Sequence, residues 1–211
     1  MDDFLTPVEQ DIREKVRGLL RPGRGLGPAE QGRDAGPAGA GRLWEAVGLP
    51  AGGGRGPGPH PGLLGRALVV EEVSAASPKL GRALLAAWPD RSRTGEAAGE
   101  LAWAIGSTAA ALGAGLDAAR KKGLFQSTLM GHQRAQGDLA DTLAAVQALR
   151  LRAYRALRLI EKGENVRGED ELGRAAGEAA AVRDRARATL GALLGEAGLA
   201  ELMPEDERSG R

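Results

Sequence analysis

Few side chains in this sequence have the types and spacing that covalent or metal chemistry requires. Cysteine is absent, which excludes disulfides, thiolate metal sites and cysteine nucleophiles together. His132 has no partner pattern around it, so we assign it no chemical role. The residues left to consider for a site are therefore mostly charged ones.

Four arginines form the most regular charged pattern: Arg150, Arg152, Arg155 and Arg158. The last three share one face of a predicted helix, the arrangement that a nucleic-acid stripe would need. Acidic residues lie on the same helix or at its ends, however, and no aromatic residues interleave. The formal net charge of +1 also gives no sign of a phosphate-backbone partner. We interpret the set as the solvated side of the helix, or as an interface with another subunit.

The composition predicts a helical protein that packs through small residues. Hydrophobic residues make up 42% of the 211 residues, but aromatic residues only 3%. Much of the apolar fraction is alanine, so stability must come from many close helix contacts rather than a few large anchors. The longest uncharged stretch, Leu101 to Leu116, is shorter than a membrane span, and the acidic N-terminal segment does not resemble a signal peptide. We expect no membrane span, and a cytoplasmic location.

Hydrophobic periodicity predicts helices and no strands, so the expected fold class is all-α. Thr6 and Pro7 open the first helix, and Ser77 with Pro78 opens a later one. Residues 21–42 are expected to be a flexible linker, because they are dominated by Gly, Pro, Ala and charge. The predicted organisation is an N-terminal helical domain with Gly/Pro-rich loops (1–88), a junction (89–96), a C-terminal up-down helical bundle (97–203) and a disordered tail (204–211). The longer helices of the bundle are predicted at about 97–122, 132–162 and 171–196.

Three stretches in order resemble the acyl-CoA dehydrogenase family. Residues 42–50 (RLWEAVGLP) with the glycines at 52–54 are similar to a helix and glycine-rich loop of its N-terminal domain. Residues 68–78 (LVVEEVSAASP) are similar to its "Glu-Glu" helix, which leads into a capped helix. The third stretch comprises residues 110–119 (AALGAGLDAA), 122–125 (KGLF), Gln133 and 139–141 (LAD), and it resembles the opening of the family's C-terminal bundle.

Two departures from the family matter for function. The family places a β-domain, which covers the flavin and part of the acyl-CoA, between its two helical domains. The eight residues at 89–96 are too few to form a sheet domain, because they span some 28 Å at most when extended. The sequence also lacks a counterpart of the family's late catalytic glutamate. The resemblance therefore implies an accessory subunit that is inactive alone, pairs with a full-length FAD-dependent homologue in a hetero-oligomer, and completes the flavin site of that homologue.

The resemblance implies roles for four residues, each of which also fits a simpler interpretation. Lys122 stands where the family has an arginine that approaches the flavin-nucleotide pyrophosphate, but it equally fits a solvated lysine at a helix end. Phe125 belongs to the same predicted cofactor-binding set, and it also fits a core residue under the loop. Gln133 matches a glutamine that contacts a neighbour's cofactor, but it also fits a surface residue at a helix start. Glu100 aligns with the base that some family members carry on this helix, and it also fits a solvated first-turn glutamate.

Two rival functions stay open from the sequence. The chain could be the active half of a heteromeric acyl-CoA dehydrogenase that uses Glu100 as its base, with FAD held mainly by a partner. Alternatively, it could be a structural or scaffolding helical protein that binds no flavin. The acyl substrate and the subunit stoichiometry are not set by the sequence.

Overall fold

The computed structural model describes residues 5–21, 37–47, 62–88, 90–121, 123–124, 127–128 and 131–202. Helices dominate this part of the chain, which confirms the all-α fold class. The helices are α1 (Pro7–Leu20), α3 (Pro37–Ala46), α4 (Leu63–Ala76), α5 (Pro78–Ala86), α6 (Arg93–Lys121), α7 (Gln133–Glu161) and α8 (Asn165–Leu202). Two short antiparallel strands, β1 (Gly123–Leu124) and β2 (Ser127–Thr128), lie between α6 and α7.

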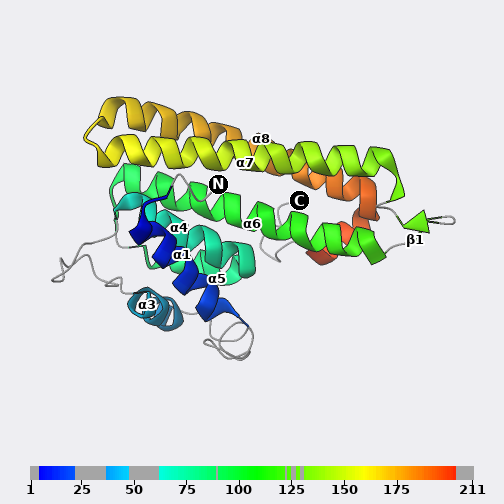
Figure 1. Cartoon of the computed structure of the whole chain (residues 1–211), viewed down its shortest axis with the longest axis horizontal. Helices are drawn as coiled ribbons and strands as arrows, with labels where there is room; N and C mark the ends of the chain where they lie inside the picture. Colours follow the sequence, from blue (N-terminus) through cyan, green and yellow to red (C-terminus); the bar gives the residue numbers. More distant parts are fainter. Residues whose placement is uncertain are drawn as a thin grey trace.

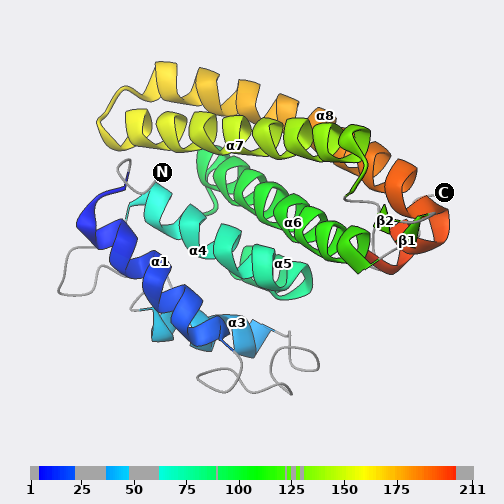
Figure 2. The same ribbon diagram turned by 45° about the vertical axis from the view of Figure 1, so that its right-hand side comes forward.

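Three long helices, α6, α7 and α8, run side by side as an up-down bundle (Figures 1 and 2). The turn between α7 and α8 closes with paired backbone bonds, from Gly163 N–H to Ile160 and from Glu164 N–H to Leu159. Gly163 has a φ of +85°, a conformation that glycine adopts without steric cost. This turn reverses the chain tightly enough for α8 to pack along α7. Near its end α8 is kinked at Gly195, where φ is +78°.

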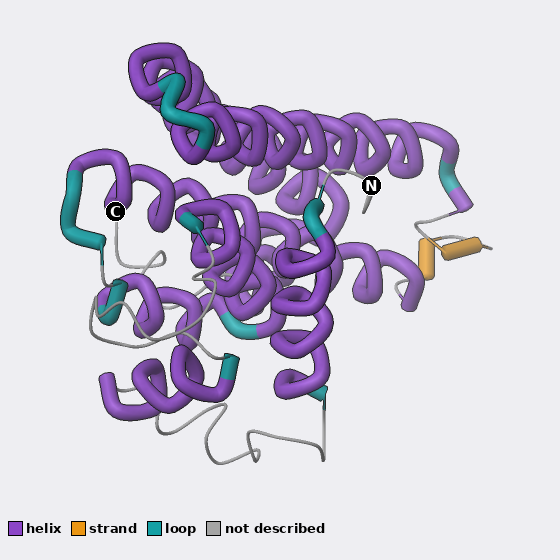
Figure 3. Tube along the Cα trace, turned by 60° about the vertical axis from the view of Figure 1, so that its left-hand side comes forward, coloured by secondary structure: helices purple, strands orange, loops and turns teal. Residues whose placement is uncertain are grey.

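Helices make up nearly all of the described chain (Figure 3). The N-terminal helices pack directly on the bundle, with α4 between α1 and α6 (Figure 2). Helix α4 contacts α1, α5, α6 and α7, and most of its residues are buried. Its buried side chains belong to one core cluster with residues of α1, α5, α6, α7 and α8. Both halves of the chain therefore share a hydrophobic core.

The close approach of α4 and α6 depends on Gly106. A Cβ atom at this position would lie closer than 3.0 Å to the backbone oxygen of Glu71 and to the side chain of Ser74. Real Cβ atoms essentially never make such contacts, so a side chain here would push the two helices apart. The small residue thus sets the helix spacing that brings α4 against the bundle.

The helix ends agree with several expectations from the sequence. The Thr6 hydroxyl accepts from the Glu9 N–H and the Glu9 carboxylate accepts from the Thr6 N–H, which completes the predicted capping box. Ser77 caps α5 as predicted, accepting from the Leu80 N–H at 3.4 Å. None of the described helices has the length and hydropathy needed to cross a membrane.

The structure also departs from the sequence expectations in two places. Residues 37–42 were expected to belong to a flexible linker, but they form the first part of α3, which begins at Pro37, a residue suited to the first turn of a helix. The β1–β2 pair was not predicted, because two-residue strands leave no periodic pattern in the sequence. Residues 22–36 and the expected tail at 204–211 lie outside the described residues.

Candidate functional site

Glu100, the carboxylate considered as a catalytic base, lies on α6 and is held by an arginine. Nη1 of Arg82, on α5, donates to both Glu100 carboxylate oxygens, at 3.0 and 2.9 Å. The Arg82 guanidinium also lies over the ring of Trp103, 3.9 Å from its centroid. The Trp103 indole N–H in turn donates to the Pro78 carbonyl at 3.1 Å. Glu100 therefore takes part in a polar clamp between α5 and α6, with its side chain 58% exposed.

Glu100 also lines a groove of about 260 Å³ between α5, α6 and α8. The walls are rich in alanine from α6 and α8, and Trp103 and Leu101 add larger apolar surface. Arg183 enters from α8, and its Nε atom is buried with no hydrogen-bond partner among the described residues. The groove shares Ala97 with a second groove of about 640 Å³ at the N-terminal ends of α6 and α8.

The other three predicted site residues come after α6 in the sequence, and only Gln133 belongs to the described part of the chain. Lys122 and Phe125 fall outside the described residues, so their roles stay predictions. Gln133 is the first residue of α7 and is exposed. His132 precedes it as the N-cap residue but makes no side-chain cap, and no acidic residue occupies the first turn. Gln133 lines neither of the two grooves, so the structure does not bring it together with Glu100.

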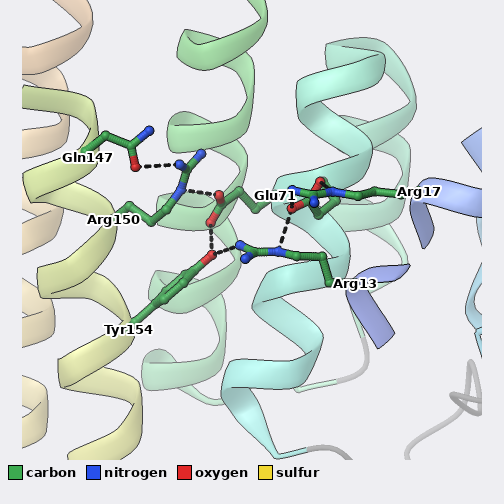
Figure 4. Close-up of polar contacts among 7 residues, drawn as sticks. Arg13, Arg17, Glu71, Gln147, Arg150 and Tyr154 are labelled. Carbon is green, nitrogen blue, oxygen red and sulfur yellow. Dashed lines mark hydrogen bonds and ion pairs between the residues drawn. The ribbon is translucent and has the colours of Figure 1, made fainter. Parts of the chain in front are cut away.

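A buried polar network joins α1, α4 and α7 around Glu71 (Figure 4). Arg150 Nε lies 2.5 Å from one Glu71 carboxylate oxygen, and the Tyr154 hydroxyl donates to the other at 3.0 Å. Arg13 donates to the Tyr154 hydroxyl oxygen at 2.8 Å from the opposite side. Arg13 also pairs with Glu72 at 2.7 Å. Charged groups from α1 and α7 thus meet across α4.

Burial sets the protonation behaviour of this network. Loss of solvent raises the pKa of Glu71, which is 2% exposed, although the Arg150 guanidinium and the Tyr154 hydroxyl oppose this shift. Burial also raises the pKa of Tyr154, and the neighbouring Glu71 carboxylate adds to the effect. Tyr154 therefore stays protonated and acts as a hydrogen-bond donor. Both Glu71 oxygens are occupied and shielded, so the network fastens helices and offers no open group to a ligand.

A second ion-pair cluster ties the start of α1 to the end of α7. Arg158 donates to Glu9 at 2.6 Å and to Glu161 at 3.1 Å. Glu161 in turn accepts from the Leu64 N–H at the start of α4, at 3.0 Å. Burial alone would raise the pKa of Glu9, but the bonds from Arg158 and Thr6 lower it below its usual value.

These contacts correct part of the interpretation of the arginine set. Arg150 and Arg158 turn inward to buried or partly buried glutamates of the same chain, whereas Arg152 and Arg155 are exposed. The described arginines of α7 therefore do not form one continuous solvated stripe. The signal available in the sequence was the pair Glu71 and Glu72 within a helix whose other residues are mostly apolar, because a buried carboxylate needs a cationic partner. Within the described residues, no cluster of His, Asp and Glu is arranged to hold a metal ion.

Comparison with known protein families gives a match to the C-terminal bundle. The model of the acyl-CoA dehydrogenase C-terminal domain matches residues 93–208, which is more than half of the chain and begins at the first residue of α6. Comparison with curated proteins and with solved structures found no match. The matched region contains the α6–α8 bundle, Glu100 and Gln133. The chain therefore belongs to the acyl-CoA dehydrogenase family, through its C-terminal helical domain.

Proposed function

We propose that this protein is an accessory acyl-CoA dehydrogenase-like subunit that is inactive alone. In this proposal it pairs with a full-length FAD-dependent homologue and contributes residues of its bundle to the flavin site of that partner. The compartment would be the cytoplasm, in keeping with the absence of cysteine. The observation that carries the proposal is the direct packing of α4 and α5 on the bundle, with residues 87–92 alone between α5 and α6.

This packing leaves little room for an acyl-CoA site of the ordinary kind within the chain. Helix α5 is clamped to α6 by Arg82, Trp103 and Glu100. The family resemblance implies a sheet domain that covers the flavin. The connection between α5 and α6 is too short to supply one. A partner would have to provide that domain and the acyl pocket.

The environment of Glu100 favours an accessory role over the active-half alternative. The Glu100 carboxylate is already engaged within its own chain, because both of its oxygens accept from Arg82 Nη1. Its side chain is also 58% exposed, whereas water-excluded surroundings strengthen the interactions that such a reaction uses. We infer that Glu100 positions α5 on α6 and does not remove a substrate proton.

Gln133 fits the proposed cofactor contact. FAD, when bound, supplies hydride acceptance in this family. Gln133 is exposed at the N-terminus of α7, where backbone N–H groups and the positive end of the helix dipole favour an anionic group such as a pyrophosphate. The first turn carries no acidic residue that would repel such a group. In this proposal the contact would be made to a cofactor held by a neighbouring subunit, as the family resemblance implies.

The test is co-expression with the full-length homologue encoded nearest to this gene. We expect the two chains to elute together in gel filtration, with flavin absorbance equal to one cofactor per pair of chains. The variant Glu100→Gln should leave turnover of the complex unchanged, whereas Gln133→Ala should weaken flavin retention. A complex that loses turnover with Glu100→Gln would establish the active-half alternative. A complex without flavin absorbance would favour the scaffolding alternative, and no complex would refute the proposal.

A further inference from the structure

The last residues of α8 fold back on the bundle beyond the kink at Gly195. Residues 165–194 run along α7, a helix of 29 residues. A straight continuation through residue 202 would extend the helix by about 10 Å, at 1.5 Å per residue. Instead, residues 196–202 turn toward the last turn of α6, at the end of the bundle where α7 begins (Figures 1 and 2).

The backbone of Gly195 makes this reversal possible. Its φ of +78° and ψ of 170° lie in a region that essentially only glycine reaches. A side chain at this position would meet nothing within 4 Å, so the glycine is required by the backbone conformation and not by packing. With ordinary helical angles at residue 195, α8 would continue straight. Gly195 is therefore the point at which two arrangements of the helix end diverge.

The contacts of the folded-back segment belong to that arrangement alone. The Leu199 side chain packs against the core, and its Cδ2 atom lies 3.5 Å from where a Cβ of residue 191 would be. In a straight helix these two positions are about 12 Å apart. A Cβ at Gly198 would lie 2.9 Å from the Leu194 Cβ, whereas residues four apart in a straight helix leave about 5–6 Å between these atoms. The segment thus covers Leu194, which packs on Ala119 in the last turn of α6.

We propose that residues 196–202 form a strap that is hinged at Gly195, closed here, and opened when α8 straightens. Neither arrangement has a large advantage. The closed strap anchors one large described side chain, Leu199, on the core, and the straight form places glycines at 191, 195 and 198 within a helix, where glycine is unfavourable. Such an element responds to a ligand that binds one form better than the other.

The location of the strap indicates what it regulates, and this step rests on the proposed function. The strap lies at the same end of the bundle as Gln133, where we place the cofactor of the partner subunit (Figure 1). A partner that docks at this end competes with the closed strap for space beside α6. Association should therefore favour the open strap, and a strap held closed should weaken association.

The hinge is tested first in the chain alone, through a cysteine pair in its cysteine-free sequence. Gly191→Cys with Leu199→Cys can form a disulfide in the closed form but not in a straight helix, because the Cα atoms would then be too far apart. In this background, Gly195→Ala should slow disulfide formation at least tenfold, and Gly198→Ala should slow it as well. Gly177→Ala is the matched control, because Gly177 lies on the same helix with nothing within 4 Å, and it should change the rate less than twofold.

The same cysteine pair then tests the effect on association. Isothermal titration compares the oxidised and reduced forms for binding to the full-length homologue, and we expect the oxidised form to bind at least tenfold more weakly. The control pair, Gly173→Cys with Ala181→Cys, has the same spacing on the straight part of α8, so oxidation should not change its binding.

The outcomes separate the strap from the proposed function. Equal rates of disulfide formation in the Gly195→Ala and Gly177→Ala backgrounds would overturn the hinge. If the oxidised and reduced forms bind equally, the strap does not regulate association, and the accessory role stands. If the wild-type chains do not associate at all, the accessory role fails together with this regulation, while the disulfide rates still decide whether Gly195 is a hinge.

Discussion

Replacement of Arg150 by methionine is predicted to be among the most damaging single changes to the fold. Methionine has a similar length, so the change removes the guanidinium while it keeps most of the apolar stem. The Glu71 carboxylate then loses its cation at 2.5 Å and keeps one described partner, the Tyr154 hydroxyl at 3.0 Å. A carboxylate that is 2% exposed has almost no access to water, so solvent cannot replace Arg150.

The size of the effect follows from the burial of this ion pair. Removal of one partner from a buried pair costs about 3–5 kcal/mol, and we expect about 3 kcal/mol because Tyr154 still donates to Glu71. The matched control is Arg152→Met on the same helix. Arg152 pairs with Glu178, and their side chains are 58% and 45% exposed. The loss of such a surface pair costs about 0–1 kcal/mol.

The dependence on pH gives this prediction a second readout. Burial already raises the pKa of Glu71, and loss of Arg150 removes an influence that lowers it. A carboxyl group whose pKa is raised in the folded state favours folding below its unfolded-state pKa, and this contribution is lost as the pH rises through the folded-state value. The deficit of Arg150→Met relative to wild type should therefore be larger at about pH 8 than at about pH 5.

Urea unfolding followed by circular dichroism at the two pH values measures both quantities. Equal free energies of unfolding for Arg150→Met and Arg152→Met at pH 8 would contradict this prediction. A deficit of Arg150→Met that grows as the pH falls would contradict it as well. Either result would mean that Glu71 is not an ionised, buried carboxylate that depends on Arg150.

Two further predictions concern helix packing and the start of α1. Gly106→Ala should destabilise the chain by about 1–3 kcal/mol, because the new Cβ would collide with α4. Gly113→Ala is the matched control, because Gly113 lies on the same helix and faces open space. It should stabilise the chain by about 0.5–1 kcal/mol. Thermal melts of the two variants decide this, and equal shifts would contradict the close α4–α6 contact. Glu9→Gln should cost about 1–2 kcal/mol at neutral pH, since it weakens the bond to Arg158. The pKa of Glu9 is lowered in the folded state, so the cost of Glu9→Gln should shrink as the pH falls through the folded-state pKa of Glu9. A cost that does not depend on pH would exclude the ion pair.

Local signals in the sequence predicted much of the fold. The capping residues Thr6 and Ser77 lie where the pattern predicted, because an N-cap is defined by residues next to each other in the chain. The long helices of the bundle also follow their predicted periodicity within a few residues. Helix α8 departs from it most, since it begins at Asn165 rather than near Glu171.

The candidate site was harder to predict from the sequence, because it depends on contacts between residues that are far apart in the chain. Glu71 and Arg150 are separated by 79 positions, and their pairing requires the α4–α7 geometry. The periodicity placed Glu71 in line with the apolar face of its helix but could not identify its partner. Likewise, the family resemblance points to Glu100 as a base, but no local pattern indicates that Arg82 on another helix binds it.

Native mass spectrometry of the complex recovered with the tagged chain from its source cells tests the accessory role most directly. The measurement gives the mass of each chain and the number of bound flavins together. We predict a full-length acyl-CoA dehydrogenase chain in the same particle, with one FAD for each pair of chains. A flavin-loaded particle that contains this chain alone and oxidises acyl-CoA would contradict the accessory role.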